Sequence, residues 1–391
     1  MYRTKLLALL FVLLLFFGCG KKEAEKYSYW LPPITDESGE MVLLLNTEVR
    51  LTVIDSAKGD SMQAELNETV IHFHQLLDPH HYYRADGERI SNLKVINDSY
   101  GTETPVKVDP DLIDALEESF VLAELTEGYF NPTVGRLSDL WTPRFSSKEH
   151  YDSDPDAKEI EEALACQLEV NELRETIEID QTNSTVTFHK NDRCSSSVRI
   201  DLGAFTKGYV LDRAYEKLIS HETSFLIDGG SSSVITYAKE GEDPSWTIGI
   251  LSPDTDSMLF AFKADNTALS TSGDYERYFL TADTDGHVIR RHHILDPFTG
   301  YSRNLYRSIS LASDKNAGVL DALSTALFSM PQDQQTRVIR NIEKQYDMKI
   351  EKSLLLQEEK QLVMQLDPSF RNRLLNDLIS SELKKIVTTA E

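Results

Sequence analysis

Asp321, Ser324 and Thr325 are spaced so that a helix would point three side-chain oxygens in one direction. They occupy positions i, i+3 and i+4 of the stretch "DALST", and residues at these spacings are neighbours on one helical face. Carboxylate and hydroxyl oxygens suit Mg²⁺, which binds through one or two carboxylates together with waters and phosphate. Without further context, the pattern favours a helix whose Ser and Thr hydroxyls bond back to the preceding turn.

A second candidate is the histidine pair His292 and His293, which opens the stretch "HHILDPFTG". A histidine within hydrogen-bond reach of a hydroxyl can serve as the base for phosphoryl transfer, because its pKa is near neutrality. The same stretch also fits an ordinary bend, since Asp-Pro and Thr-Gly are common turn sequences. Neighbours on a strand point to opposite faces, so at most one of the two histidines should face a ligand.

Four further segments combine glycine with small hydroxyl residues beside an expected strand or helix end: residues 127–141, 200–214, 226–234 and 268–279. Such loops allow backbone N–H groups to approach a phosphate closely, and a helix N-terminus adds the positive end of its dipole. One such loop is usually a turn. Four in one chain, next to the histidine stretch, favour a phosphate-containing ligand.

The elements that would position these residues are helices and strands in mixed order. Periodicity predicts helices at 61–77, 109–128 and 204–222, a short helix containing Ile160 and Leu164, and a helix that opens at 316. It predicts strands at 41–55, in two parts of 176–190, and at 196–203, 224–230, 245–251, 259–273, 290–297 and 307–313. Residues 142–159 have no periodicity and are expected to form an exposed loop. Strict βαβ alternation is absent, so we predict a single large α+β domain at residues 41–335, with a mixed, mainly antiparallel sheet flanked by helices. Residues 336–391 are expected to form a C-terminal helical segment packed on the domain or extending it.

The N-terminus predicts export. Arg3 and Lys5 precede an unbroken apolar run, and Gly18 and Cys19 follow it; this is the order of a secretory signal rather than of a membrane span. Ending on Gly-Cys resembles a bacterial lipoprotein signal, so we expect residues 1–18 to be a signal peptide, Cys19 to be lipidated and residues 19–40 to be a tether. A plain signal peptide with a chance cysteine is the alternative.

Composition restricts the partners. The chain has 391 residues and a formal net charge of −24, and both nucleic acid and anionic lipid require a basic surface. We therefore expect no nucleic-acid partner, and membrane attachment through an acyl anchor rather than through surface charge. Cys166 and Cys194 could form a disulfide in an exported protein, but the sequence leaves open whether they approach each other.

Five motifs in order resemble one family: "NPTVGRLSDLW" from residue 131, "DLGAFTKGYVLDRA" from 201, "LSTSGDY" from 269, "HHILDPFTG" from 292 and "DALSTALF" from 321. Together they resemble the FAD:protein FMN transferases, the ApbE family of exported flavin-transferring lipoproteins, over roughly residues 45–330. The resemblance implies an ApbE-like fold, FAD as substrate and Mg²⁺ as cofactor.

The resemblance also implies roles for individual residues. His293 matches the family's single histidine before the Asp-Pro corner and is the expected base. The metal set is Asp321 and Thr325, the backbone carbonyl of Ala204, and Ser324 at a position where some members have Asp. The residues expected to contact the flavin nucleotide are Tyr129, Phe130, Asn131, Asp201, Lys207, Leu295 and His80. Asn131 stands where Asp is more usual, so a negative charge is lost there.

The implied reaction is Mg²⁺-dependent transfer of FMN from FAD to a Thr or Ser hydroxyl of an acceptor protein, with release of AMP. The implied acceptor is a subunit of a membrane redox complex, and the implied location is the periplasmic face of a bacterial membrane. Two alternatives remain open: an FAD pyrophosphatase that yields FMN and AMP, and an exported FAD-binding lipoprotein without catalysis.

Overall fold

The computed structural model describes residues 24–146, 153–230, 232–255, 257–282, 285–358 and 361–388. The expected signal peptide and Cys19 lie outside the described residues. In the part of the chain that is described, no helix has the length and apolar character that crossing a membrane requires.

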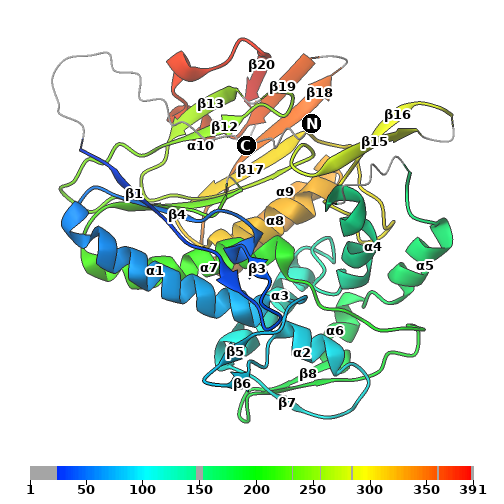
Figure 1. The fold of residues 1–391 in the computed structure, drawn as a ribbon. Helices are drawn as coiled ribbons and strands as arrows, with labels where there is room; N and C mark the ends of the chain where they lie inside the picture. Colours follow the sequence, from blue (N-terminus) through cyan, green and yellow to red (C-terminus); the bar gives the residue numbers. More distant parts are fainter. Residues whose placement is uncertain are drawn as a thin grey trace, which may run out of the picture.

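A nine-stranded sheet forms the centre of the molecule (Figure 1). Its neighbours are antiparallel except for the last pair, β19 and β20, which is parallel. The strands in spatial order are β1 (Tyr27–Trp30), β4 (Arg50–Val53), β10 (Phe225–Asp228), β11 (Ser233–Tyr237), β14 (Ala268–Gly273), β17 (Ser308–Ser313), β18 (Glu351–Glu358), β19 (Gln361–Leu366) and β20 (Leu383–Thr388). The predicted mixed, mainly antiparallel sheet is therefore confirmed.

Three long helices cover one face of this sheet: α1 (Ser56–Leu77), α7 (Gly203–Leu218) and α8 (Ala317–Ser329). The opposite face is covered by the hairpin of β12 (Thr247–Leu251) and β13 (Met258–Lys263) and by α10 (Pro368–Arg373). Alternate residues of β14 therefore face different layers: Leu269 packs into the second core, whereas Ser270 points towards α8. This alternation brings strand hydroxyls to the α8 face.

The remaining elements extend the helical side of the molecule or lie at its edges. The helices are α2 (Leu93–Asp98), α3 (Pro110–Leu125), α4 (Gly135–Ser146), α5 (Ala157–Ala165), α6 (Leu173–Thr176) and α9 (Gln332–Tyr346), with 3₁₀ turns at Leu44–Asn46, Val170–Glu172, Ile219–His221 and Asn376–Leu378. The small sheets are β2 (Ile34–Thr35) with β3 (Met41–Val42), β5 (Arg84–Ala85) with β6 (Glu88–Arg89), β7 (Val106–Lys107) with β9 (Thr185–Phe188) and β8 (Ile177–Asp180), and β15 (Tyr278–Ala282) with β16 (Val288–His292).

The prediction for the C-terminal segment was wrong. Helix α9 ends at Tyr346, and β18, β19 and β20 then extend the central sheet from β17. Polar and charged residues made the segment resemble an exposed helix. Yet Leu354 and Leu355 are both buried, on opposite faces of the sheet. Pairing with β17 and cover on both faces outweigh the local composition.

Two boundaries near the N-terminus also differ from expectation. The expected tether contains β1, which pairs with β4 at the sheet edge, so the folded part begins before residue 41. The expected strand at 41–55 is interrupted by a 3₁₀ turn that carries Leu45 and Asn46 at positive φ.

Two further differences lie in the middle of the chain. Residues 196–203 form one bridge, Arg199 with Val134, rather than a strand. Helix α4 continues to Ser146, so the expected loop begins later than residue 142.

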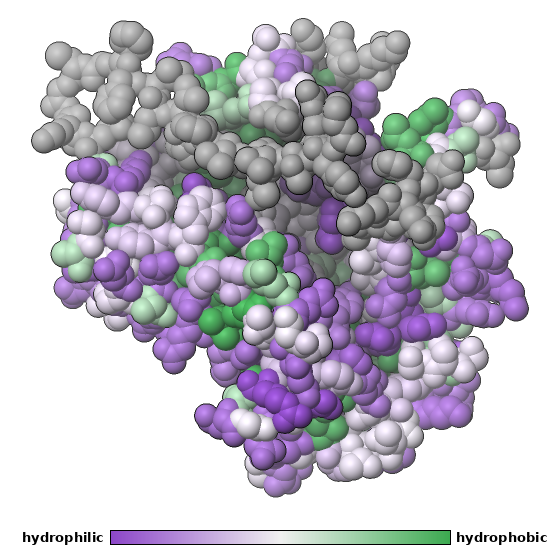
Figure 2. Space-filling model, viewed as in Figure 1, coloured by the Kyte–Doolittle hydropathy of each residue, from purple (hydrophilic) through white to green (hydrophobic). Residues whose placement is uncertain are grey.

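Hydrophilic side chains dominate the visible face of the molecule, as Figure 2 shows. This agrees with the net charge of −24. An apolar group stands out on the β15–β16 hairpin, where Leu280 and Val288 are 53% and 73% exposed. The rest of the apolar side chains are mostly in two cores, one on each face of the central sheet.

Candidate functional site

The site is built where α7 crosses α8. The backbone N–H of Gly208 donates to Oδ2 of Asp321 over 2.6 Å, and the hydroxyl of Ser233 donates to Oδ1 over 2.7 Å. The crossing is so close that a Cβ on Gly208 would lie 2.2 Å from the carbonyl oxygen of Ala317. A glycine is therefore required for Asp321 to reach the α7 backbone.

Asp212 fixes the start of α8. Its two carboxylate oxygens accept the N–H groups of Ala317 and Gly318 over 2.8 and 2.9 Å. Asn316, the residue that precedes the helix, has a left-handed backbone and provides no side-chain cap. Asp212 thus caps α8 from α7, and this remote cap sets the rotation of the helix that carries Asp321. Burial raises the pKa of Asp212 to about 7, against the lowering effect of the two amides.

Ser324 and Thr325 face the central sheet beside Asp321. The hydroxyl of Ser324 is 3.0 Å from that of Ser270 and 2.8 Å from that of Ser272, and Thr325 Oγ1 is 3.4 Å from Ser272. The three α8 side chains therefore share one face, as their spacing predicts. The hydroxyl of Ser324 also donates back to the carbonyl of Asp321 over 3.1 Å, as the alternative interpretation expected. The shared face meets alternate hydroxyls of β14 and forms an oxygen-rich layer.

Ala204 lies one turn before Gly208 on α7. In a regular helix the N–H of Gly208 bonds to the carbonyl of Ala204, and here the same N–H donates to Asp321. Asp321 therefore meets the α7 backbone one turn beyond Ala204. Burial raises the pKa of Asp321, whose side chain is almost fully enclosed, and Lys207 opposes that rise. A buried carboxylate with neutral hydroxyl neighbours is expected to hold a cation, so this donor set fits a hard divalent ion such as Mg²⁺.

His293 follows the end of β16, and its backbone N–H donates to the carbonyl of Arg277 over 3.1 Å. This contact closes the base of the β15–β16 hairpin. Nδ1 of His293 is buried and has no hydrogen-bond partner among the described residues. Burial lowers the pKa of His293 well below its usual value, and the positive charges of Arg277 and Lys207 lower it further. The imidazole is therefore neutral at neutral pH and has a ring nitrogen available for a proton.

Its neighbour His292 points the other way, as expected for adjacent strand residues. The His292 side chain is fully buried, lies edge-on to Phe328 and pairs through Nε2 with the carbonyl of Arg303 over 3.0 Å. Burial lowers the pKa of His292 to about 4. His292 is thus part of the core, and His293 is the histidine on the side of the site.

Lys207 lies between the α8 oxygens and His293 in its electrostatic effect. Its charge acts on both His293 and Asp321, which places the ammonium group within electrostatic range of the imidazole and of the carboxylate. A cation in this position would hold an anionic group between the candidate base and the candidate metal ligands. Arg277 adds a second positive charge on the histidine side.

Asp201 and His80 both lie close enough to Asp139 for their charges to act on it. Oδ1 of Asp201 accepts the N–H of Gly203 at the start of α7 over 2.8 Å. Asp139 in turn pairs with Arg199 over 3.0 Å. The backbone of Arg199 lies beside Val134 in a parallel bridge. The two motif segments that begin at residues 131 and 201 are thereby held side by side.

The structure gives Tyr129, Phe130 and Asn131 different surroundings. Tyr129 lies edge-on to the exposed Phe298, and Phe130 is buried against Phe205 of α7. The amide of Asn131 donates to the carbonyl of Leu168, and its oxygen accepts both the N–H and the hydroxyl of Thr133. Asn131 therefore has its side chain engaged in holding the loop.

Leu295 is half-buried against the small apolar cluster around Trp141. Asn131 also lines a surface cavity of about 500 Å³ that runs between the 127–131 and 167–171 segments and Phe298. Leu295, two residues beyond His293, and this cavity lie at the end of the histidine stretch. None of the residues that line this cavity belongs to α8.

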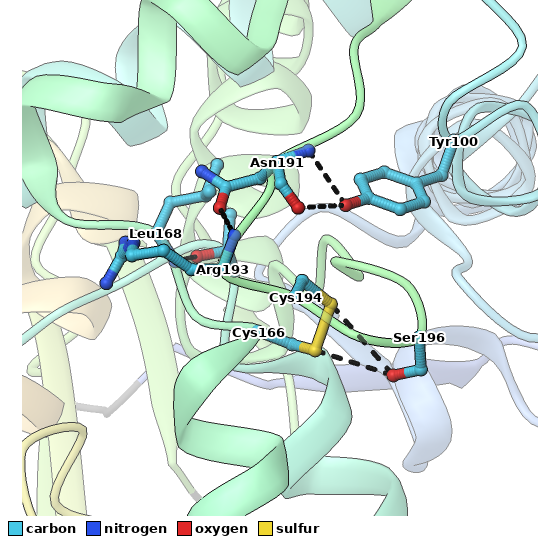
Figure 3. The surroundings of a disulfide bond; sticks show 8 residues. Tyr100, Cys166, Leu168, Asn191, Arg193, Cys194 and Ser196 are labelled. Carbon is cyan, nitrogen blue, oxygen red and sulfur yellow. Dashed lines mark hydrogen bonds between the residues drawn. A yellow bond between two sulfur atoms is a disulfide. The ribbon is translucent and has the colours of Figure 1, made fainter.

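A disulfide between Cys166 and Cys194 supports this part of the site (Figure 3). Both cysteines are buried, and their Cα atoms are 4.3 Å apart. The adjoining Leu168 accepts from Asn131 and donates its N–H to Thr133, while Gln167 donates to the carbonyl of Pro297 over 3.0 Å. Cys166 and Cys194 therefore do pair, which the sequence left open. Residues 167 and 168, next to Cys166, join the 131 segment to the histidine stretch.

Some residues of the site were not singled out from the sequence: Ser233, Ser270, Ser272, Gly208, Asp212 and Arg277. The two serines of β14 alternate with other residues, and this period of two could have indicated that they share a face. Asp212 carried no comparable signal, because its role depends on the helix crossing.

The fold and the site together define a class of protein. It has a mainly antiparallel sheet, and a buried carboxylate and hydroxyls lie on its helical face. The charge of Lys207 acts on this carboxylate and on one neutral imidazole. This arrangement suits a divalent cation and a phosphate-containing ligand.

Comparison with known proteins gives the family: the ApbE family model matches residues 45–350, and the chain belongs to this family. The FAD:protein FMN transferase of Treponema pallidum is 28% identical over 310 residues, which are 76% of this chain and 80% of the relative. That of Rhodobacter capsulatus is 31% identical over 257 residues, 66% of this chain and 44% of the relative.

Solved structures agree with the sequence relatives. The ApbE protein of Thermotoga maritima superimposes with a TM-score of 0.64 at 29% identity, covering 85% of this chain and 94% of that one. The flavin transferase ApbE of Vibrio cholerae has a TM-score of 0.65 at 22% identity, covering 90% and 100%, and supports the fold. The resemblance drawn from the five motifs is confirmed.

Proposed function

We propose that this chain is a transferase that moves FMN from FAD to a hydroxyl of an acceptor protein. Family membership and the names of its relatives support this reaction. The observation that carries the proposal is the buried layer of oxygens around Asp321, Ser324 and the serines of β14, with Lys207 close enough for its charge to act on Asp321 and on His293. A diphosphate between these groups would have the candidate base on the side of the attacking hydroxyl and the candidate metal ligands on the side of its negative charge.

The reaction is a substitution at the phosphorus on the FMN side of FAD. A Thr or Ser hydroxyl of the acceptor forms the new P–O bond, and the P–O bond to AMP breaks. The proton of the hydroxyl goes to a ring nitrogen of His293, whose imidazole is neutral and therefore able to accept it. Lys207 and Arg277 oppose the negative charge of the diphosphate.

The proposed cofactor is Mg²⁺, held by Asp321 and Thr325, by Ser324 and by the carbonyl of Ala204. When bound, the ion would neutralise charge on the phosphates and on the departing AMP. Ser324 replaces a carboxylate with a hydroxyl that already contacts Ser270 and Ser272. Asp321 is therefore the one carboxylate of the proposed set.

The proposed contacts to the flavin nucleotide are Tyr129, Phe130, Asn131, Asp201, Lys207, Leu295 and His80. Phe130 and Asn131 act by shaping the loop, since their side chains are engaged in packing and in hydrogen bonds. We further propose that Cys19 is lipidated after removal of residues 1–18, and that the enzyme works on the periplasmic face of a bacterial membrane. The proposed acceptor is a membrane redox-complex subunit.

The proposal is tested by incubating the purified protein with FAD and Mg²⁺, with and without an acceptor protein of a family relative. Transfer predicts that AMP release depends on the acceptor and that the acceptor gains the mass of FMN less one water. AMP and free FMN without acceptor would instead identify a pyrophosphatase. A stable FAD complex that releases no AMP in either mixture would identify a flavin-binding protein without catalysis.

A further inference from the structure

A second group of ligand atoms lies away from α8, where the β2–β3 hairpin meets the loop after α1. One ligand atom each from Asp36, Glu40 and His81 lie within 4.8 Å of one another. A cavity of about 260 Å³ opens beside them and is lined by Asp36, His81 and their neighbours, including His80. An imidazole with two carboxylates next to accessible space is the donor set of a transition-metal site.

His81 is held in place by a residue outside this group. Its Nδ1 is 2.8 Å from Oδ2 of Asp78, whose carboxylate is buried and also accepts the hydroxyl of Tyr83 over 2.7 Å. The carbonyl of His81 accepts from the side chain of the fully buried Asn92. A carboxylate that orients a histidine in this way is the usual support of a metal-ligating imidazole, and it leaves Nε2 for the ion.

The carboxylates are also positioned by their surroundings. Oδ1 of Asp36 accepts the N–H groups of Ser38 and Glu40 over 2.9 and 2.8 Å, so the turn is closed and Oδ2 remains for a ligand. The N–H of Glu37 donates to the carbonyl of Tyr82 over 2.8 Å, which attaches the hairpin turn to the loop that carries His81. Little rearrangement is needed for the three side chains to share one ion.

A similar group elsewhere provides a comparison. His72, Asp109 and Asp111 also have ligand atoms within 4.8 Å of one another. There, however, Nε2 of His72 is already paired with Asp111 over 2.7 Å, and one oxygen of Asp109 caps α3. Neither the cavity beside His81 nor the one beside Asn131 is lined by this group. At His72 the ion pair and the helix cap therefore use ligand atoms of the group itself. At His81 the pairing uses Nδ1 and the turn uses Oδ1 of Asp36, so that Nε2 and Oδ2 remain for an ion.

We infer that Asp36, Glu40 and His81 form a site for a divalent transition-metal ion of the Zn²⁺ type. One nitrogen and two oxygen ligands favour such an ion over Mg²⁺, which prefers oxygen alone. The ion attaches the β2–β3 hairpin to the loop after α1 and thereby fixes the segment that carries His80. Asp36 and Glu40 precede residue 45, where the family match begins, so two of the three ligands lie in a part of the chain that the family model does not cover.

The test is a titration of the purified protein with Zn²⁺ by calorimetry, in excess Mg²⁺ so that oxygen-only sites are occupied. Co²⁺ in place of Zn²⁺ gives a visible absorption band that reports nitrogen and oxygen ligation. The variants are His81→Asn, Asp36→Asn and Glu40→Gln, each of which removes one ligand and keeps the side chain polar. Asp36→Asn retains the oxygen that closes the turn. His72→Asn is the matched control.

We expect one saturable Zn²⁺ site in the unmodified protein and in His72→Asn, and affinity reduced by at least about 10-fold in each of the three ligand variants, the lower end of what metal sites lose even through supporting residues. Circular dichroism should show the same fold throughout. The inference is overturned if the unmodified protein binds no Zn²⁺, if His81→Asn binds it equally well, or if His72→Asn is the variant that loses it.

Discussion

The backbone N–H of Gly208 donates a hydrogen bond of 2.6 Å to the carboxylate of Asp321. This contact joins α7, which carries Ala204 and Lys207, to α8, which carries the predicted metal ligands. The two helices can meet in this way because neither Gly208 nor Gly318 has a side chain at the crossing. The geometry of the candidate metal set therefore depends on the distance between two helix backbones.

A Gly208→Ala substitution tests this dependence. In an ordinary helix the change would stabilise the protein by up to about 1 kcal/mol, but here the new Cβ would lie 2.2 Å from a backbone oxygen of α8. We expect the free energy of unfolding to fall by about 1–3 kcal/mol, the usual cost of overpacking. Urea denaturation measures it. A more stable variant would show that the helices separate easily.

Asp321→Asn tests the metal site. At a Mg²⁺ concentration of about 100 times the dissociation constant, binding should stabilise the unmodified protein by about 2.7 kcal/mol. The variant should lose this Mg²⁺-dependent rise in melting temperature, because it lacks the one carboxylate of the proposed set. Asp314→Asn, an exposed carboxylate before α8, is the control and should keep the rise. An equal rise in both variants would place Mg²⁺ elsewhere.

The pH dependence of kcat/KM for FAD reports on His293. A base must be neutral, and its pKa is lowered by burial and by Arg277 and Lys207. The part of the profile that depends on His293 should therefore stay level as the pH falls through about 6.5, the usual pKa of histidine, and be lost only below it. Lys207→Gln removes a positive charge and should move this loss to higher pH. A loss that is centred above that ordinary histidine value and that Lys207→Gln shifts would contradict the lowered pKa of His293, whereas a loss near pH 7 that Lys207→Gln leaves in place would belong to Asp212.

Loss of the disulfide should weaken FAD binding and lower the stability of the protein, while the central sheet still forms. The cysteines are 28 residues apart, so the loop-closure model gives about 3–4 kcal/mol of stabilisation. We expect the Cys166→Ser, Cys194→Ser double variant to melt at a lower temperature and to bind FAD more weakly. Fluorescence titration with FAD provides the second measurement. Unchanged FAD affinity would mean that the loop between the cysteines does not position the flavin site.

Much of the site could be predicted from the sequence because its chemistry is local. The spacing of Asp321, Ser324 and Thr325 on one helix, and the opposite orientation of His292 and His293, follow from helix and strand geometry alone. The α+β class followed from the order of periodic segments. These features require no knowledge of which elements become neighbours.

Features that depend on tertiary pairing could not be predicted. Asp212 caps a helix that begins 105 residues later in the chain, and nothing in its own surroundings indicates that partner. The C-terminal strands resembled helices because their composition is polar, and pairing with β17 decided their structure. The Cys166–Cys194 pairing likewise depends on the distance between the two Cα atoms, which their separation in the sequence does not determine.

The most direct test of the central claim uses mass spectrometry of an acceptor protein incubated with FAD, Mg²⁺ and either the unmodified enzyme or His293→Ala. The unmodified enzyme should add FMN to one Thr or Ser of the acceptor. His293→Ala should bind FAD with similar affinity but add FMN about 10²- to 10⁴-fold more slowly, as expected when a general base is removed. Equal rates of modification by both proteins would show that His293 is not the base.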